Sequence, residues 1–151
     1  MYKPGEMYSA LKQVGISAIG GLALLAAGCA TPWENVESLT AKVEPLRMES
    51  KGGDNYHIFR LTVCNSGGDT VVFDKLSGFL NNSGIFYSEG KDWFSKRAGT
   101  NTLEASKCLT VRDAYFWTTR PSETMTESWE GDMKGKRVGV KYSISTGDFK
   151  K

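Results

Sequence analysis

The sequence predicts an all-β fold, a single β-sandwich domain of about seven strands that covers residues 39–151. From Leu39 onward, apolar residues recur at every second position, which is the period of a half-buried strand and not of a helix. Short clusters of glycine, asparagine, aspartate and serine separate these runs at intervals typical of a β-sandwich. Together the two observations favour short strands joined by tight turns around one core.

Two strands are expected at the start of the domain, over residues 39–48 and 56–65, with a turn at 51–54 between them. Pro45 interrupts the first alternating run. Because proline cannot donate a backbone hydrogen bond to a neighbouring strand, it predicts an edge strand or a bulge at this point. The inward face of the second run is expected to consist of Phe59, Leu61 and Val63.

The middle of the domain is expected to hold shorter strands. A turn over residues 66–69 leads into a strand at 70–74, and residues 81–84 form a second hairpin turn between short apolar segments. Residues 88–102 are polar and show neither strand nor helix periodicity, so they are expected to be an irregular loop.

The last part of the chain predicts strands at 105–113, 115–117 and 137–145. Residues 120–136 are mostly polar and are expected to form a long connection. The inward face of the final strand is expected to consist of Val138, Val140, Tyr142 and Ile144.

The run from Leu61 to Phe73 resembles the second and third strands of an immunoglobulin-like domain. In that pattern an apolar strand is followed by an Asn-x-Gly turn, here Asn65 to Gly67, and then by the next strand. Residues 100–113 similarly resemble the approach to the fifth strand. The resemblance implies an immunoglobulin-like β-sandwich in which the second and fifth strands are neighbours in one sheet.

The N-terminal segment has the features of an export signal. Lys3 and Lys12 precede an apolar run over residues 16–27, whose 12 residues are too few to span a bilayer. A spanning helix needs about 20 residues. A basic flank, a short apolar core and small residues at its end are typical of a cleaved signal peptide.

The five residues from Leu25 to Cys29 resemble a bacterial lipobox, with Ala26 at the place where leucine is usual. The resemblance implies cleavage between Gly28 and Cys29. It also implies a diacylglycerol and an N-acyl chain, typically palmitate, on Cys29, which is the sole cofactor-like group expected. The implied organisation is a signal peptide at 1–28, a lipidated tether at 29–38 and the β-sandwich at 39–151.

The residue after the lipidated cysteine is Ala30 and not the aspartate that retains such proteins in the inner membrane. The resemblance therefore implies an outer-membrane lipoprotein that faces the periplasm or the cell surface. Trp33, within the tether, is expected either to lie at the membrane interface or to pack on the domain.

Removal of residues 1–28 leaves 123 residues, which suit one domain with one core. It also leaves 17 of the 19 basic and 16 of the 17 acidic side chains. A near-balanced charge does not favour a nucleic-acid partner.

Cys64 and Cys108 remain as an even pair in an exported, oxidising compartment, where a structural disulfide is expected. Both cysteines neighbour core positions in their strands, so both point away from the core. In an immunoglobulin-like order, the bond would join adjacent strands on an outer face or near an edge. No metal site is expected, because the lone His57 is the only other soft ligand.

Few residues indicate catalysis. His57 is expected to be a solvated residue at a strand end, and no nucleophile motif accompanies it. The carboxylates of Glu127, Glu130 and Asp132 could hold calcium or serve glycoside hydrolysis. The favoured interpretation is that they lie in a solvated loop. The basic group of Lys134, Lys136, Arg137 and Lys141 is expected to be solvated, with anionic lipid or a protein as alternative contacts.

Aromatic residues suggest a partner-binding surface. Tyr115, Phe116 and Trp117 are consecutive, and neighbouring residues of a strand alternate sides, so they cannot all enter one core. Trp117 or Phe116 is expected to be partly exposed, with Trp93 or Trp129 nearby. The alternative is that loop 88–102 or 120–136 folds over this strand.

These features favour a non-catalytic accessory lipoprotein that binds another envelope protein, as an assembly or exclusion factor. The alternative is a cell-wall glycan hydrolase or hydrolase inhibitor that uses the aromatic strand with Glu127 or Glu130. Two carboxyls about 5–9 Å apart in a cleft would favour the enzyme.

Overall fold

A computed structural model describes residues 32–149 of the chain. The predicted signal peptide at 1–28, the predicted cleavage site at Gly28 and Cys29, Ala30, and the two C-terminal lysines lie outside the described residues. Lipidation therefore stays a prediction. Within residues 32–149, no helix is long and apolar enough to cross a membrane.

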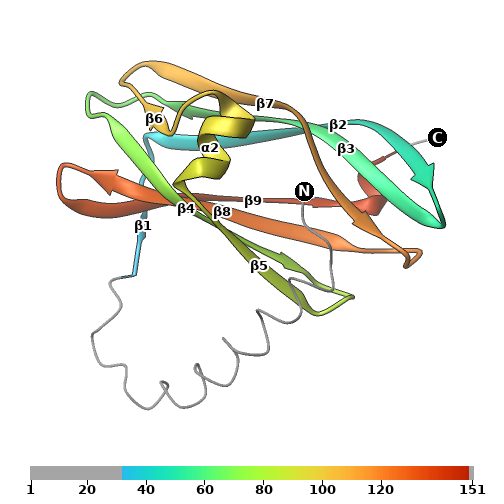
Figure 1. Ribbon diagram of the computed structural model, residues 1–151. Coiled ribbons are helices and arrows are strands. Elements are labelled where there is room, and N and C mark those ends of the chain that lie inside the picture. Colours follow the sequence, from blue (N-terminus) through green and yellow to red (C-terminus); the bar gives the residue numbers. More distant parts are fainter. Residues whose placement is uncertain (1–31, 150–151) are drawn as a thin grey trace, which may run out of the picture.

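Within residues 32–149, two β-sheets face each other across the core, with one α-helix at their side (Figure 1). The smaller sheet has the strand order β2-β3-β7, and the larger has the order β1-β9-β8-β4-β5, with β6 paired to β4. This arrangement confirms the all-β prediction and its two-layer form.

The smaller sheet consists of β2 (Leu39–Lys51), β3 (Asp54–Asn65) and β7 (Lys107–Thr118). As expected from Pro45, β2 is an edge strand, and its register with β3 shifts between Pro45 and Arg47. Cys64 and Cys108 are directly opposite each other on β3 and β7, with Cα atoms 4.0 Å apart, and form the expected disulfide.

The larger sheet consists of β1 (Glu34–Asn35), β4 (Val71–Leu80), β5 (Ile85–Gly90), β6 (Thr102–Leu103), β8 (Thr124–Met133) and β9 (Lys136–Ser145). The predicted strand at 70–74 and the short apolar segment before the predicted turn at 81–84 belong to one strand, β4, whose pairing with β8 shifts between Phe73 and Lys75. A short 3₁₀ helix, η1 (Thr146–Asp148), follows β9.

The core lies between the sheets and follows the predicted alternation in β3 and β9. Its largest side chains come from both layers and from the helix. Those that solvent hardly reaches include Phe59, Leu61, Phe73, Leu76, Phe94 and Trp129. The single-core prediction therefore fits the described residues.

The prediction of an irregular loop at residues 88–102 is wrong, because α2 (Lys91–Ala98) lies within it. Asp92 in its first turn and Lys96 in its last turn complement the helix dipole. Gly99 ends the helix in the left-handed conformation, with φ of 89°, which glycine adopts without strain. The helix contacts β4, β5 and β7 and buries Phe94.

The prediction of a polar connection at residues 120–136 is also wrong, because β8 occupies most of it. Met125, Glu127 and Trp129 of β8 point into the core, and the residues between them point outward. A glutamate at an inward position breaks the apolar alternation from which a strand is usually recognised.

The chain joins the domain earlier than the predicted boundary at residue 39. Glu34 and Asn35 pair in parallel with Val138 and Gly139 of β9. Trp33 packs on Gly139, where an added Cβ atom would lie 2.5 Å from the indole ring. This corrects the tether prediction for residues 34–38 and places Trp33 on the domain.

Candidate functional site

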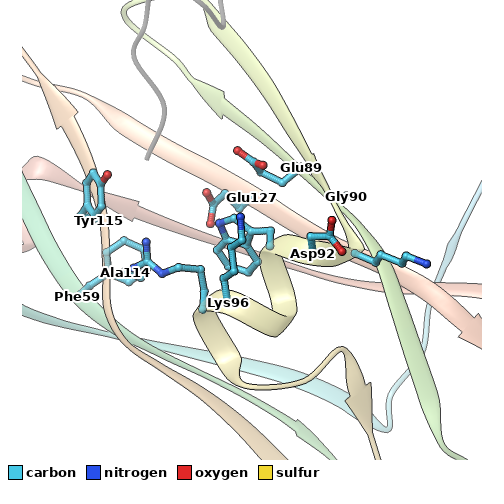
Figure 2. Close-up of a pocket in the computed structure, with 11 residues that line it drawn as sticks. Phe59, Glu89, Gly90, Asp92, Lys96, Ala114, Tyr115 and Glu127 are labelled. Carbon is cyan, nitrogen blue, oxygen red and sulfur yellow. The ribbon is translucent and has the colours of Figure 1, made fainter.

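A pocket of about 510 Å³ opens beside α2, between the two sheets (Figure 2). We call it the α2 pocket. Residues of β3, β5, α2, β7 and β8 line it. Its apolar walls are formed by Phe59 and Ala114 from the smaller sheet and by Trp93 from the helix. Tyr115, from the predicted aromatic strand, stands at its side.

Glu127 brings a carboxyl group to this pocket from the inner face of β8. Only 6% of its surface is exposed. The Tyr87 hydroxyl donates a hydrogen bond to Oε2 of Glu127, and the Tyr142 hydroxyl donates one to Oε1, each at 2.5 Å. The indole N–H of Trp129 donates in turn to the Tyr142 hydroxyl at 2.9 Å. The carboxyl is therefore held from both sides.

The sheet register builds this arrangement. Tyr87 of β5 is opposite Gly78 of β4, Gly78 is opposite Glu127 of β8, and Glu127 is opposite Tyr142 of β9. A Cβ atom on Gly78 would lie 2.1 Å from the Tyr87 ring. Glycine at this position therefore lets the tyrosine cross β4 and reach the carboxyl group.

Burial raises the pKa of Glu127, and the hydrogen bonds from Tyr142 and Tyr87 oppose this rise. Glu89 lines the same pocket from β5, and burial raises its pKa as well, while the positive charge of Lys96 opposes the rise. Figure 2 shows both carboxyls on the same side of α2. Among residues 32–149, neither carboxyl has a basic side chain within ion-pair distance.

The basic residues at the pocket come from α2. The Arg97 guanidinium donates to the backbone carbonyl of Asp113 at 2.7 Å and lies 5.8 Å from the centre of the Tyr115 ring. Lys91 and Lys96 are exposed at the rim. The pocket therefore has a buried acidic floor and a solvated basic rim.

The predicted aromatic partner surface is divided among three places. Tyr115 and Trp93 line the α2 pocket. Trp117 is half-buried on the outer face of the smaller sheet, with its ring centre 6.1 Å from that of Tyr56. Tyr115 also contacts Tyr56, at 5.6 Å, so it connects this outer face with the edge of the pocket. Phe116 and Trp129 are buried in the core, which corrects their proposed role in direct partner contact.

His57 is buried, so the expectation of a solvated histidine is wrong. Its imidazole stacks on Phe116, with ring centres 4.9 Å apart, and meets the edge of Phe149 at 5.0 Å. Burial lowers its pKa, and the backbone of Asn55 opposes this shift. His57 therefore packs as an aromatic core residue at one end of the sandwich.

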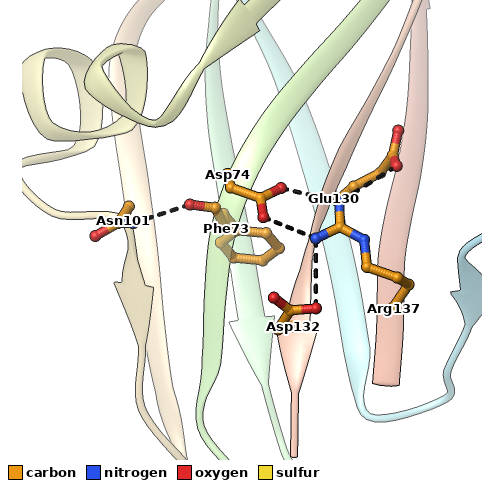
Figure 3. A network of polar contacts seen from close by, with 6 residues as sticks. All are labelled: Phe73, Asp74, Asn101, Glu130, Asp132 and Arg137. Carbon is orange, nitrogen blue, oxygen red and sulfur yellow. Dashed lines mark hydrogen bonds and ion pairs between the residues drawn. The ribbon is translucent and has the colours of Figure 1, made fainter. Parts of the chain in front are cut away.

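The three predicted loop carboxylates separate onto the two faces of β8. Glu127 points inward, whereas Glu130 and Asp132 point outward to Arg137, at 3.6 and 3.4 Å (Figure 3). Arg137 also makes a two-point contact with Asp74, at 2.7 and 2.9 Å, which lowers the pKa of that carboxyl.

This network ties β9 to β4 across β8. In the predicted basic group, Arg137 is thus engaged, and Lys134 pairs with Asp69 at 3.0 Å. In the described part of the chain, no three His, Cys, Asp or Glu side chains are placed to hold a metal ion.

No family profile and no curated protein matches the chain. Solved structures resemble its fold, among them the following two. The crystal structure of the putative ApaA protein from Bordetella pertussis is 11% identical, with a TM-score of 0.53, and the match covers 76% of this chain and 95% of that one. The X-ray structure of a structural genomics target is also 11% identical, with a TM-score of 0.52, over 71% and 83% of the two chains. At this identity the likeness concerns the fold alone.

Proposed function

We propose that this protein is a non-catalytic, lipid-anchored binding protein of the bacterial envelope and that its partner enters the α2 pocket. The observation that carries the proposal is the Glu127 carboxyl, which two tyrosine hydroxyls hold in one orientation at the floor of an open pocket. A fixed polar group among apolar walls is typical of a recognition site.

The predicted anchor is joined to one edge of the larger sheet, and the strand at the opposite edge contributes to the pocket. The chain enters through β1 at one edge, whereas β5, which carries Glu89, forms the other. Five strands separated by about 4.8 Å put these edges about 19 Å apart. If Cys29 carries the lipid, the five Cα-to-Cα steps from Cys29 to Glu34 span at most about 17 Å. A short link at the β1 edge would leave the pocket free to meet a partner.

The finer fold prediction, an immunoglobulin-like sandwich behind a cleaved signal peptide, belongs to the same proposal. The strand order supports it, because β3 and β7 are neighbours in the smaller sheet, joined by the outer disulfide. The parallel pairing of β1 with β9 also fits such a topology.

Photo-cross-linking in intact cells tests the binding function. A photo-reactive phenylalanine analogue replaces Lys96 at the rim of the pocket or, as the control, Phe86, which is exposed on the outer face of β5. We expect a defined protein adduct from position 96 and none of that mass from position 86. Absence of an adduct at 96, or the same adduct from both positions, would contradict the proposed site.

A glycan hydrolase is the second candidate, because the Glu89 and Glu127 carboxyls share a pocket and burial raises both pKa values. Glu130, the other predicted acid, is on the opposite face of β8 and cannot join them. Incubation of the purified protein with peptidoglycan separates the candidates. We expect no release of glycan fragments; release that Glu127→Gln abolishes would establish the enzyme instead.

A further inference from the structure

The charge of the α2 pocket changes with depth. Glu127, at the floor, is more than nine-tenths buried and makes no ion pair with any of residues 32–149. A carboxylate removed from water without a cation in contact is costly, and a positive group that binds beside it with good hydrogen-bond geometry offsets this cost. The floor of the pocket therefore favours a cationic group.

The two tyrosine hydrogen bonds leave room for such a group. A carboxylate has about four acceptor positions, two on each oxygen. Tyr87 uses one position on Oε2, and Tyr142 uses one on Oε1. The remaining positions can accept hydrogen bonds from a ligand. The hydroxyls thus orient the carboxyl without saturating it.

Glu89 adds a second acid on the same wall. It is two residues after Tyr87 in β5, so both side chains point to the inner face of the sheet. Two of the three basic residues oppose a cation only weakly, because Lys91 and Lys96 are exposed and water and salt screen their charges. Arg97 donates to the neutral Asp113 carbonyl and keeps its charge, which acts on Glu127 from beyond ion-pair distance.

The walls of the pocket suit an apolar stem behind the charged group. Phe59 and Ala114 form one apolar side, and the Trp93 indole forms another. Tryptophan is also the aromatic residue that attracts cations most strongly through its ring face. A volume of about 510 Å³ accommodates an extended side chain or a small molecule.

We propose that the α2 pocket binds an alkylammonium group, of the kind that a lysine side chain carries, with the ammonium at Glu127 and the methylene stem along Phe59, Ala114 and Trp93. The inference rests on the proposed function and names the chemistry that the partner presents. It assigns Glu127 the role of the ligand's counter-ion and Glu89 the role of a second, more exposed acid.

The test uses the full protein purified from membranes in detergent. The probe is N-acetyl-lysine methylamide, and N-acetyl-norleucine methylamide has a similar apolar stem without the ammonium group. Binding is followed by tryptophan fluorescence, because Trp93 lines the pocket. We expect saturable binding of the lysine derivative, and binding of the norleucine derivative weaker by about tenfold or more.

Two variants complete the test. Glu127→Gln keeps the shape of the side chain but removes its charge. It should weaken binding of the lysine derivative by about tenfold or more, because the loss of one partner of a buried charge pair weakens binding at least that much. Glu130→Gln, on the opposite face of β8, should leave binding unchanged. Thermal unfolding checks that both variants fold. If Glu127→Gln does not fold, Glu89→Gln takes its place as the variant. The comparison of the two probes on the unchanged protein then still decides the result.

Equal binding of the two probes, no binding of the lysine derivative, or full binding by a folded Glu127→Gln variant would overturn the inference. The cross-linking experiment keeps this failure separate from failure of the proposed function. An adduct at position 96 without lysine-derivative binding would leave a binding protein whose ligand has other chemistry. Absence of an adduct at position 96 would instead contradict the proposed binding site itself.

Discussion

Tyr87 and Glu127 are 40 residues apart in the sequence and on strands that are not neighbours, and their side chains still meet at 2.5 Å. Gly78, on the strand between them, makes this possible, because the Tyr87 ring occupies the space that a side chain there would fill. The polar floor of the α2 pocket therefore depends on one glycine at one register position.

Gly78→Ala should lower the free energy of unfolding by about 1–3 kcal/mol, as overpacking of a core does. The added methyl would overlap the Tyr87 ring, which must move away from Glu127. Gly68→Ala is a matched control, because a Cβ atom there meets nothing within 4 Å. Denaturant unfolding of both variants measures the difference, and equal stabilities would contradict the close approach.

Reduction of the Cys64–Cys108 bond should lower the free energy of unfolding by about 4 kcal/mol, the value that chain entropy predicts for a loop of this size. Unfolding with and without a reductant measures the change. The double variant Cys64→Ala, Cys108→Ala should not respond to the reductant. Peptide mass mapping that finds both thiols free in the exported protein would contradict the bond.

Acid should destabilise the protein through His57. An unfolded chain holds a histidine with a pKa near 6.5, whereas burial lowers the pKa of His57 in the folded state. The unfolded state therefore binds more protons below about pH 6.5, and the free energy of unfolding falls as the pH drops through that range.

The control for this prediction is His57→Phe, which keeps an aromatic ring between Phe116 and Phe149 but cannot titrate. Its free energy of unfolding should depend less on pH between about 7.5 and 5.5 than that of the unchanged protein. Identical pH profiles would show that His57 is not the group responsible.

Cys29→Ser should abolish lipid attachment. Cells that produce the unchanged protein should incorporate a palmitate analogue into it, and the variant should remain unlabelled. Labelled variant protein would refute the lipobox resemblance. Fractionation should place the unchanged protein in the outer membrane, as the Ala30 prediction requires, and stable recovery from the inner membrane would contradict it.

Much of the fold follows from alternation along single strands. In β3 and β9, inward residues are apolar and neighbours are polar, so their faces and the outward direction of Cys64 were predictable. Helix α2 was not predictable in this way, because eight residues with one buried side chain show little periodicity. Its clearest local signal is Gly99, at its C-terminal end. In β8, Glu127 occupies a place where a strand normally has an apolar residue.

The candidate site depends on relationships between strands, which sequence periodicity does not report. Tyr87, Gly78, Glu127 and Tyr142 form one row only because four strands pair in a particular register. The predicted aromatic group was divided for the same reason. Tyr115 and Trp93 reach the pocket from β7 and α2, whereas Trp129 fills the core beneath them.

The yield of the cross-linked adduct at position 96, compared between the Glu127→Gln and Glu130→Gln backgrounds in intact cells, tests the central claim most directly. Both variants remove one carboxylate from β8, but only the first removes it from the pocket. We expect the adduct to fall by about tenfold or more in the Glu127→Gln background and to persist in the other. Equal yields in the two backgrounds would contradict a binding function that depends on the α2 pocket.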